Sequence, residues 1–71
     1  MLDWTEVVSS NIKAIGYDAD SEELHFKFMN GTEYAYYGAP KEVYDEMMQA
    51  PSKGKFFYSE IKDKFVYRKI G

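Results

Sequence analysis

Apolar residues recur at strand spacing through the first half of the chain. The segment 11–17 carries this pattern, and the segment 24–28 alternates strictly between apolar and polar residues. An acidic polar stretch separates the two, and Asn30-Gly31 marks a second reversal into the segment 32–37. The first half is therefore predicted to form three antiparallel strands joined as a meander.

The loop at Asn30-Gly31 decides which side chains of the second hairpin are buried. A two-residue turn would place Glu33 opposite Phe28 on the apolar face, which is unfavourable. A three-residue loop, 29–31, with Gly31 in the left-handed conformation keeps the large apolar side chains on one face. The pairs predicted for this loop are Leu24 with Tyr36, Phe26 with Tyr34, and Lys27 with Glu33.

The second half of the chain has helical spacing. Pro40 suits the first turn of a helix that runs to about Ala50, and Ser52 suits the N-cap of a second helix. The closing segment 66–70 alternates weakly, which is compatible with a last strand or with an extended tail. Apolar residues recur every four positions along the second helix at Phe57, Ile61 and Phe65.

These elements predict an α+β fold, a small three-stranded antiparallel meander followed by two short helices. The pattern does not decide whether a short C-terminal strand follows. A length of 71 residues leaves room for a single domain, 1–71. The chain has 18% aromatic residues and no cysteine, so burial of apolar surface must stabilise the fold without disulfides. Most of the tyrosine and phenylalanine rings are therefore expected in the core.

The composition excludes several kinds of chemistry. The absence of cysteine excludes disulfides, thiolate nucleophiles and iron–sulfur clusters, and a single histidine excludes any site that needs two. That residue, His25, falls on the polar side of its strand with Lys27 and Glu33 and is expected at the surface. No pair of carboxylates is fixed by spacing. We therefore expect no enzyme, no bound metal and no cofactor.

The cellular location expected for the protein follows from two further observations. No run of apolar residues is long enough to cross a membrane. The first residues are acidic, whereas a secretory signal would begin with basic ones. The sequence thus predicts a cytoplasmic protein that does not bind membranes.

Charge is segregated between the two ends of the chain. Residues 1–51 hold ten acidic side chains and three lysines, whereas residues 52–71 hold six basic and two acidic ones. The basic part can attract an anionic partner such as a nucleic acid. Alternatively, it lies on the acidic half of the same chain, and the sequence alone leaves both arrangements open.

The stretch 52–58, Ser-Lys-Gly-Lys-Phe-Phe-Tyr, is the part of the chain most suggestive of a binding site. Its lysines surround a helix start, where free N–H groups and the positive end of the helix dipole can hold a phosphate. An exposed ring there, Phe56 or Tyr58, could stack on a base. The alternative is an ordinary capped helix with solvated lysines and aromatic core residues.

A set of residues spread along the chain forms a further pattern: Ser9-Ser10, Ile12, Gly16-Tyr17, Leu24, Phe26, Phe28, Gly31, Tyr34, Tyr36, Pro40, Val43-Tyr44, Ala50, Ser52, Gly54, Phe56-Phe57 and Ile61. In this combination the sequence resembles the KTSC domain over nearly its whole length. Members of that family occur at the C-terminus of some lysyl-tRNA synthetases and alone in small bacterial and viral proteins. The resemblance implies a connection with RNA, whereas fold and family do not by themselves settle function.

The sequence therefore predicts a non-catalytic module that binds RNA or single-stranded nucleic acid. The alternative is a protein–protein module that binds a protein partner, or forms a homo-oligomer, through an edge strand or exposed aromatic residues. The net charge of −3 favours this alternative. The residues expected to contact nucleic acid are Ser52, Lys53, Lys55, Lys62 and Arg68 at phosphates, and Phe56 or Tyr58 at a base.

Overall fold

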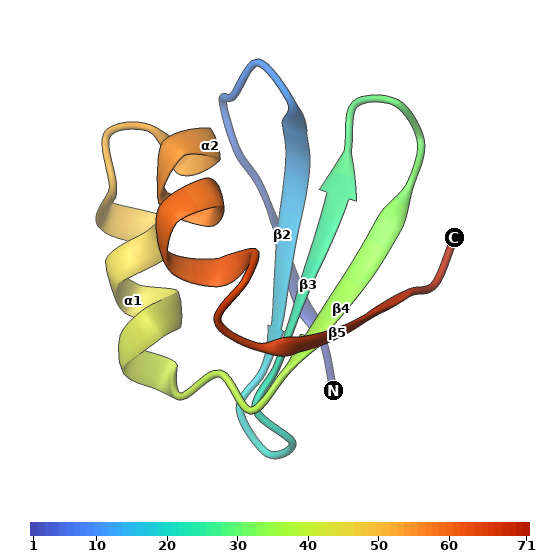
Figure 1. Cartoon of the computed structure of the whole chain (residues 1–71), viewed down its shortest axis with the longest axis vertical. Helices are drawn as coiled ribbons and strands as arrows, with labels where there is room; N and C mark the ends of the chain where they lie inside the picture. The colour runs from blue at the N-terminus through green and yellow to red at the C-terminus, as the bar shows by residue number, and fades with distance from the viewer.

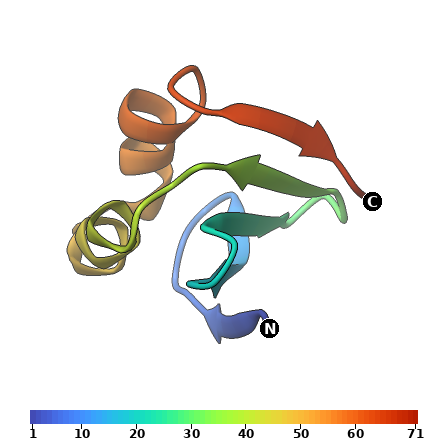
Figure 2. The same ribbon diagram turned by 90° about the horizontal axis from the view of Figure 1, so that it is seen from below.

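The structure, a computed structural model, describes residues 1–71 and consists of one antiparallel sheet with helices on one face (Figures 1 and 2). The strands are β1 (Asp3–Glu6), β2 (Ile12–Asp18), β3 (Glu23–Phe28), β4 (Glu33–Tyr37) and β5 (Val66–Lys69), and they lie in the sheet in this order. The helices are α1 (Lys41–Gln49), α2 (Lys53–Phe56) and the π-helix η1 (Phe57–Ile61). None of them is long and apolar enough to span a membrane.

The α+β class is confirmed, but the sheet has five strands rather than the three predicted. The closing segment forms β5, which pairs with β4 and places Tyr67 opposite Tyr36. The hydrophobic pattern does not predict β1, because all four of its residues are exposed at the sheet edge and show no apolar alternation. Both additional strands therefore lie at the edges of the predicted meander.

The register of the β3–β4 hairpin is confirmed. Leu24 lies opposite Tyr36, Phe26 opposite Tyr34 and Lys27 opposite Glu33. The backbone N–H of Phe28 donates to the carbonyl oxygen of Thr32 at 2.9 Å, so this pair closes a loop of residues 29–31. Gly31 in this loop has a φ of +91°, a left-handed conformation that side chains disfavour. Because this loop prevents a one-residue slip, the rings of the hairpin point toward the helices.

The core lies between the sheet and the helices. Phe26, in the middle of β3, is completely buried, and its ring centroid lies 4.9 Å from that of Phe57 and 5.6 Å from that of Tyr36. Met47 of α1 and Ile61 of η1 are also completely buried. Phe57 and Ile61 follow the predicted spacing, and both helical segments contribute to one core. Phe65, predicted to continue this helix, instead lies after the end of η1 and is partly buried against the core.

Tyr17 fastens α1 and the segment before it to the sheet. Its hydroxyl donates a hydrogen bond of 2.7 Å to the carbonyl oxygen of Ala39, and its ring stacks on Tyr44 of α1 at a centroid distance of 4.7 Å. Burial raises the pKa of Tyr17, with a smaller contribution from nearby carboxylates. The helix itself begins at Lys41, with Pro40 as its N-cap residue, and ends at Gln49.

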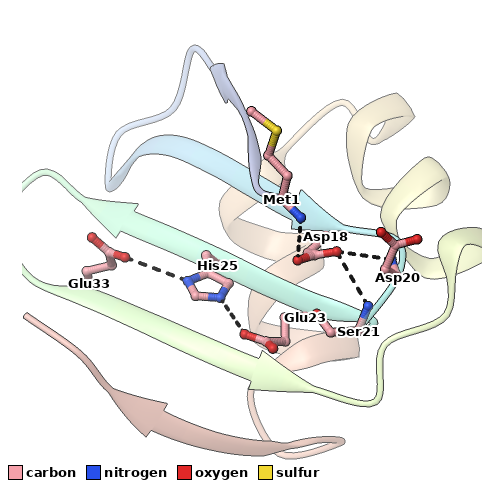
Figure 3. A network of polar contacts seen from close by, with 7 residues as sticks. All are labelled: Met1, Asp18, Asp20, Ser21, Glu23, His25 and Glu33. Carbon is pink, nitrogen blue, oxygen red and sulfur yellow. Dashed lines mark hydrogen bonds and ion pairs between the residues drawn. The ribbon is translucent and has the colours of Figure 1, made fainter.

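Asp18 organises the turn between β2 and β3. Its carboxylate accepts hydrogen bonds from the backbone N–H groups of Asp20 and Ser21 and pairs with the Met1 amino group at 2.8 Å (Figure 3). The pairing with the amino group, followed by these N–H groups, lowers the pKa of Asp18. The acidic turn predicted between the two strands is thus held by its own first residue.

The sheet face opposite the helices buries the single histidine. His25 faces the polar side, as predicted, but it is 6% exposed and not a surface residue. Its ring lies between two carboxylates, with Nε2 3.1 Å from Glu23 and Nδ1 3.6 Å from Glu33 (Figure 3). Trp4 of β1 covers it, edge to face, at a centroid distance of 6.1 Å. The missed strand β1 therefore explains the burial that the sequence did not predict.

Trp4 can lie on this face because Gly16 has no side chain. Trp4 and Gly16 are direct partners in the β1–β2 register, and a Cβ atom at Gly16 would lie 2.9 Å from the indole ring. The ammonium group of Lys27 lies 4.3 Å from the centre of the same ring, which adds a cation–π contact.

Replacement of Gly16 by alanine is expected to displace Trp4 and to lower the free energy of unfolding by about 1–2 kcal/mol, in the range of overpacking substitutions. The chain has one tryptophan, so its fluorescence reports this displacement directly as a shift to longer wavelength. In a chain that already carries Trp4→Ala, the same replacement should cost almost nothing by circular dichroism. An equal cost in both backgrounds would contradict the proposed clash.

Candidate nucleic-acid interface

The stretch predicted to bind nucleic acid forms α2 and the start of η1. The hydroxyl of Ser52 accepts a hydrogen bond of 3.2 Å from the backbone N–H of Lys55, which confirms Ser52 as the N-cap of α2. The loop before β2 packs closely against this helix. A Cβ atom at Gly54 would lie 2.8 Å from the side-chain oxygen of Asn11, so glycine allows the contact.

The π-helical turn of η1 determines which aromatic residues reach the solvent. The backbone N–H of Lys62 donates to the carbonyl oxygen of Phe57, five residues earlier, at 2.9 Å. Phe57 and Ile61 are buried, whereas Tyr58 is 63% exposed. The turn therefore directs Tyr58 outward between two lysines of the same segment, Lys55 and Lys62.

Tyr58 and these two lysines form a continuous polar surface with Ser52, which we call the Tyr58 surface (Ser52, Lys55, Tyr58 and Lys62). The ammonium of Lys62 lies 4.4 Å above the centre of the Tyr58 ring. Ser52, Lys55 and Tyr58 also line a shallow hollow of about 330 Å³ together with Ser10, Asn11 and Gly54.

The cations of the second half form no ion pair, although the ammonium of Lys53 donates to two backbone carbonyl oxygens. The ion pairs of the structure involve the Met1 amino group, His25 and Lys41, and none involves a basic residue beyond position 51. The alternative in which this basic part neutralises the acidic half of the same chain therefore has no ion pair to support it. The Tyr58 surface combines unpaired positive charge with an exposed ring.

A second feature lies directly beside this surface, and the sequence analysis did not find it. A cavity of about 230 Å³ opens between η1 and strands β3, β4 and β5. Lys62 and Asp63 contribute the charged groups of its lining. We call this cavity the aromatic cup, and its remaining lining residues are Phe28, Tyr34, Tyr36, Phe57 and Tyr67.

The five rings of the cup form a closed circle in which each ring contacts the next. The centroid distances around the circle are 5.3 Å for Phe28–Phe57, 5.6 Å for Phe57–Tyr36, 5.4 Å for Tyr36–Tyr67, 6.0 Å for Tyr67–Tyr34 and 5.9 Å for Tyr34–Phe28. These separations are typical of interacting aromatic pairs. Three separate strands and η1 supply the rings, so only the folded chain brings them together.

Tyr36 is the most buried of the three tyrosines of the cup. Tyr36 is 3% exposed, and burial raises its pKa to about 12, with smaller contributions from Tyr67, Tyr34 and Asp63. The lining of the cup therefore includes a tyrosine with a raised pKa close to a carboxylate.

Comparison with known proteins places this architecture in a family. The sequence profile of the KTSC domain matches residues 8–65. The chain belongs to the KTSC domain family. The crystal structure of a KTSC domain protein from Yersinia pestis is 43% identical in sequence, and the match covers 100% of both chains with a TM-score of 0.93.

Other relatives include small proteins and large enzymes. A protein of Tsukamurella paurometabola is 41% identical over 59 residues, which are 83% of this chain and 88% of that protein. The lysine–tRNA ligase of Trichormus variabilis is 38% identical over 61 residues. That match covers 86% of this chain but 11% of the ligase, so this chain corresponds to a small part of that enzyme.

This KTSC domain brings together four of the seven predicted interface residues, those of the Tyr58 surface. Lys53 instead caps α1, because its ammonium donates to the carbonyl oxygens of Met48 at 2.9 Å and Ala50 at 2.7 Å. Phe56 is half-buried: it packs against the core, and its remaining surface lines a hollow with Ser52 and Lys55. Arg68 pairs with Ala35 in the register and lies on the sheet face opposite the helices, one position after Tyr67 of the cup.

Proposed function

We propose that this KTSC domain is a non-catalytic cytoplasmic module that binds RNA or single-stranded nucleic acid through the Tyr58 surface. The observation that carries the proposal is an exposed tyrosine between Lys55 and Lys62, neither of which pairs with a carboxylate. An exposed ring can stack on any unpaired base, and flanking ammonium groups can contact the phosphates on either side.

The relationship to lysine–tRNA ligases supports this proposal. Those enzymes act on tRNA according to their name, and the matching region is 11% of their length. A small domain carried by an RNA-dependent enzyme is compatible with an auxiliary RNA contact. The argument for this chain nevertheless rests on the Tyr58 surface, because family membership alone does not determine function.

Replacement of Lys55 and Lys62 together by glutamine tests the proposal. We expect the wild-type domain to bind a fluorescently labelled single-stranded RNA at low salt and to lose affinity as salt rises, since phosphate contacts release counterions. The double variant should bind more weakly at low salt. Its plot of log affinity against log salt concentration should be shallower by about 0.7 for each lysine removed, as for a single strand. Fluorescence anisotropy at several ionic strengths measures both quantities.

A matched control is the double replacement of Lys13 and Lys41 by glutamine, which removes the same charge from exposed positions outside the Tyr58 surface. Its salt dependence should equal that of the wild type. Absence of binding at low salt, or the same reduced slope in both double variants, would refute the assignment of this surface.

A second candidate function is self-association or binding of a protein partner through β5. This strand has no partner on its outer edge. Val66, its first residue, is 75% exposed, and Ile70, which follows it, is 49% exposed. Exposed edge strands pair readily with other chains. Sedimentation equilibrium distinguishes the candidates, because pairing through β5 gives a dimer whose stability does not depend on the two lysines.

A further inference from the structure

We infer that the aromatic cup holds one unpaired guanine base of the bound strand, with Asp63 and Lys62 recognising its Watson–Crick edge. This inference rests on the proposed function, since it names the base that the interface selects. It uses a different part of the molecule from the Tyr58 surface, and Lys62 is the one residue shared by both.

The size and lining of the cup suit a single planar ring system. Pockets for drug-sized ligands usually measure about 300–1,000 Å³, whereas the cup measures about 230 Å³. It can thus accept a base while the sugar and phosphate stay outside. Five aromatic side chains surround the space, and unpaired bases are commonly held by stacking on such rings.

The polar groups of the cup select among the bases. Guanine presents two adjacent donors, N1–H and the N2 amino group, beside the acceptor O6. A carboxylate can accept two parallel hydrogen bonds from neighbouring donors, and an ammonium can donate to O6. Asp63 and Lys62 are consecutive residues that both line the cavity. Adenine and cytosine lack a pair of adjacent donors on this edge, and uracil lacks the amino group.

Tyr36 adds a hydroxyl group to the lining of the cup. The residue is 3% exposed and lines the cavity beside Asp63. A base inside the cup would offer ring nitrogens or a carbonyl oxygen to this hydroxyl.

The cup lies close enough to Tyr58 for one nucleic-acid strand to contact both. Phe57 belongs to the circle of rings, and its centroid lies 6.4 Å from that of Tyr58 in an edge-to-face arrangement. The exposed ring and the cup are therefore neighbours on either side of η1. One base can stack on Tyr58 while an adjacent one enters the cup, and Lys62 lies between them.

Binding of nucleosides to the isolated domain tests the cup without any RNA. We expect guanosine 5′-monophosphate to shift the amide resonances of Tyr36, Tyr67 and Asp63 in a two-dimensional NMR titration. Inosine 5′-monophosphate, which lacks only the N2 amino group, should bind at least about fivefold more weakly, the lower limit for a lost base-specific pair. Uridine 5′-monophosphate should leave these resonances unchanged.

Variants of the cup then connect the site to RNA binding. A single-stranded RNA with one guanosine in a uridine background should bind at least about fivefold more tightly than the same strand with inosine. Replacement of Asp63 by asparagine should remove that preference, because an amide offers one acceptor in place of two. Replacement of Asp20 by asparagine in the exposed β2–β3 turn changes the charge equally and should preserve the preference.

The outcomes separate the two proposals. If RNA binding depends on Lys55 but guanosine and inosine strands bind equally, the guanine assignment is wrong and the proposed function stands. If guanosine monophosphate occupies the cup while no RNA binds, the cup is a nucleotide site and the proposed function fails. If the tetramethylammonium ion, and not guanosine monophosphate, shifts the cup resonances, the cup is a site for methylated ammonium groups and the inference is overturned.

Discussion

Replacement of Phe57 by alanine is expected to unfold the domain, or to leave it at the margin of stability, at ambient temperature. Phe57 joins η1 to the sheet, with centroid distances of 4.9 Å to Phe26, 5.3 Å to Phe28 and 5.6 Å to Tyr36. Truncation of a buried phenylalanine typically costs about 3–5 kcal/mol. A domain of this length has a total stability of about 4–10 kcal/mol.

The neighbouring residue gives a matched control for this substitution. Tyr58 is adjacent in sequence but 63% exposed, so Tyr58→Ala should change the free energy of unfolding by less than about 1 kcal/mol. Phe57→Leu keeps most of the apolar volume and provides a folded variant for comparison. Urea denaturation followed by circular dichroism measures all three. Similar midpoints for Phe57→Ala and Tyr58→Ala would contradict the proposed core.

Alkaline conditions are expected to unfold the protein as the pH approaches 12. Burial raises the pKa of Tyr36 from 10.0 to about 12, so the folded state resists loss of this proton more strongly than the unfolded state. The stabilisation is fully present below pH 10 and is lost as the pH rises through about 12. Each pKa unit corresponds to about 1.4 kcal/mol, and solvent in the open cup keeps the loss of stability below the value for the full shift. Tyr17, whose pKa burial also raises, adds to the effect in the same direction.

Tyr36→Phe isolates the contribution of this hydroxyl. The variant keeps the ring in the core but has no proton to lose at this position, so its unfolding midpoint should fall less steeply above pH 10 than that of the wild type. The matched variant Tyr58→Phe changes an exposed ring outside the core and should follow the wild-type curve. Tyrosinate absorbance and urea denaturation between pH 9 and pH 12 provide the two readouts. Parallel curves for Tyr36→Phe and the wild type would exclude the assigned role.

The central hairpin and the helices could be predicted from the sequence because their signals are local. The turn at Asn30-Gly31 and the alternation on both sides of it fix the register within a short segment. Ser52 and the spacing of Phe57 and Ile61 similarly predict the second helical segment. In each case the residues that decide the structure lie within a few positions of one another.

The edges of the sheet could not be predicted in the same way. The residues of β1 are exposed, and that strand depends on a glycine in β2 that leaves room for Trp4. The burial of His25 follows from that same contact and from Glu33 on the next strand. Sequence alternation correctly assigned the face of His25, but burial on that face depends on residues distant in sequence.

The candidate site shows the same contrast between residues that are close in sequence and residues that only the fold brings together. Ser52, Lys55 and Tyr58 lie in one segment, and the sequence identified them together, although it also included Lys53, whose ammonium caps α1. The aromatic cup draws on β3, β4, β5 and η1, so no local pattern reveals it. Its one sequence signal was the Tyr-x-Tyr pattern at Tyr34 and Tyr36, which the hairpin register had assigned to the core.

The consecutive order of the strands has a consequence for the folding kinetics of the domain. Strands β1 to β4 pair only with their neighbours in sequence, which keeps the loops to be closed short and favours rapid formation. β5 pairs with β4 only after residues 38–65, which include all the helices, have folded back across the sheet. Closure of this longer loop has the largest entropic cost, so β5 should dock last and open first. Tyr67 belongs to β5, so hydrogen exchange should show the wall of the cup opening before the rest of the sheet.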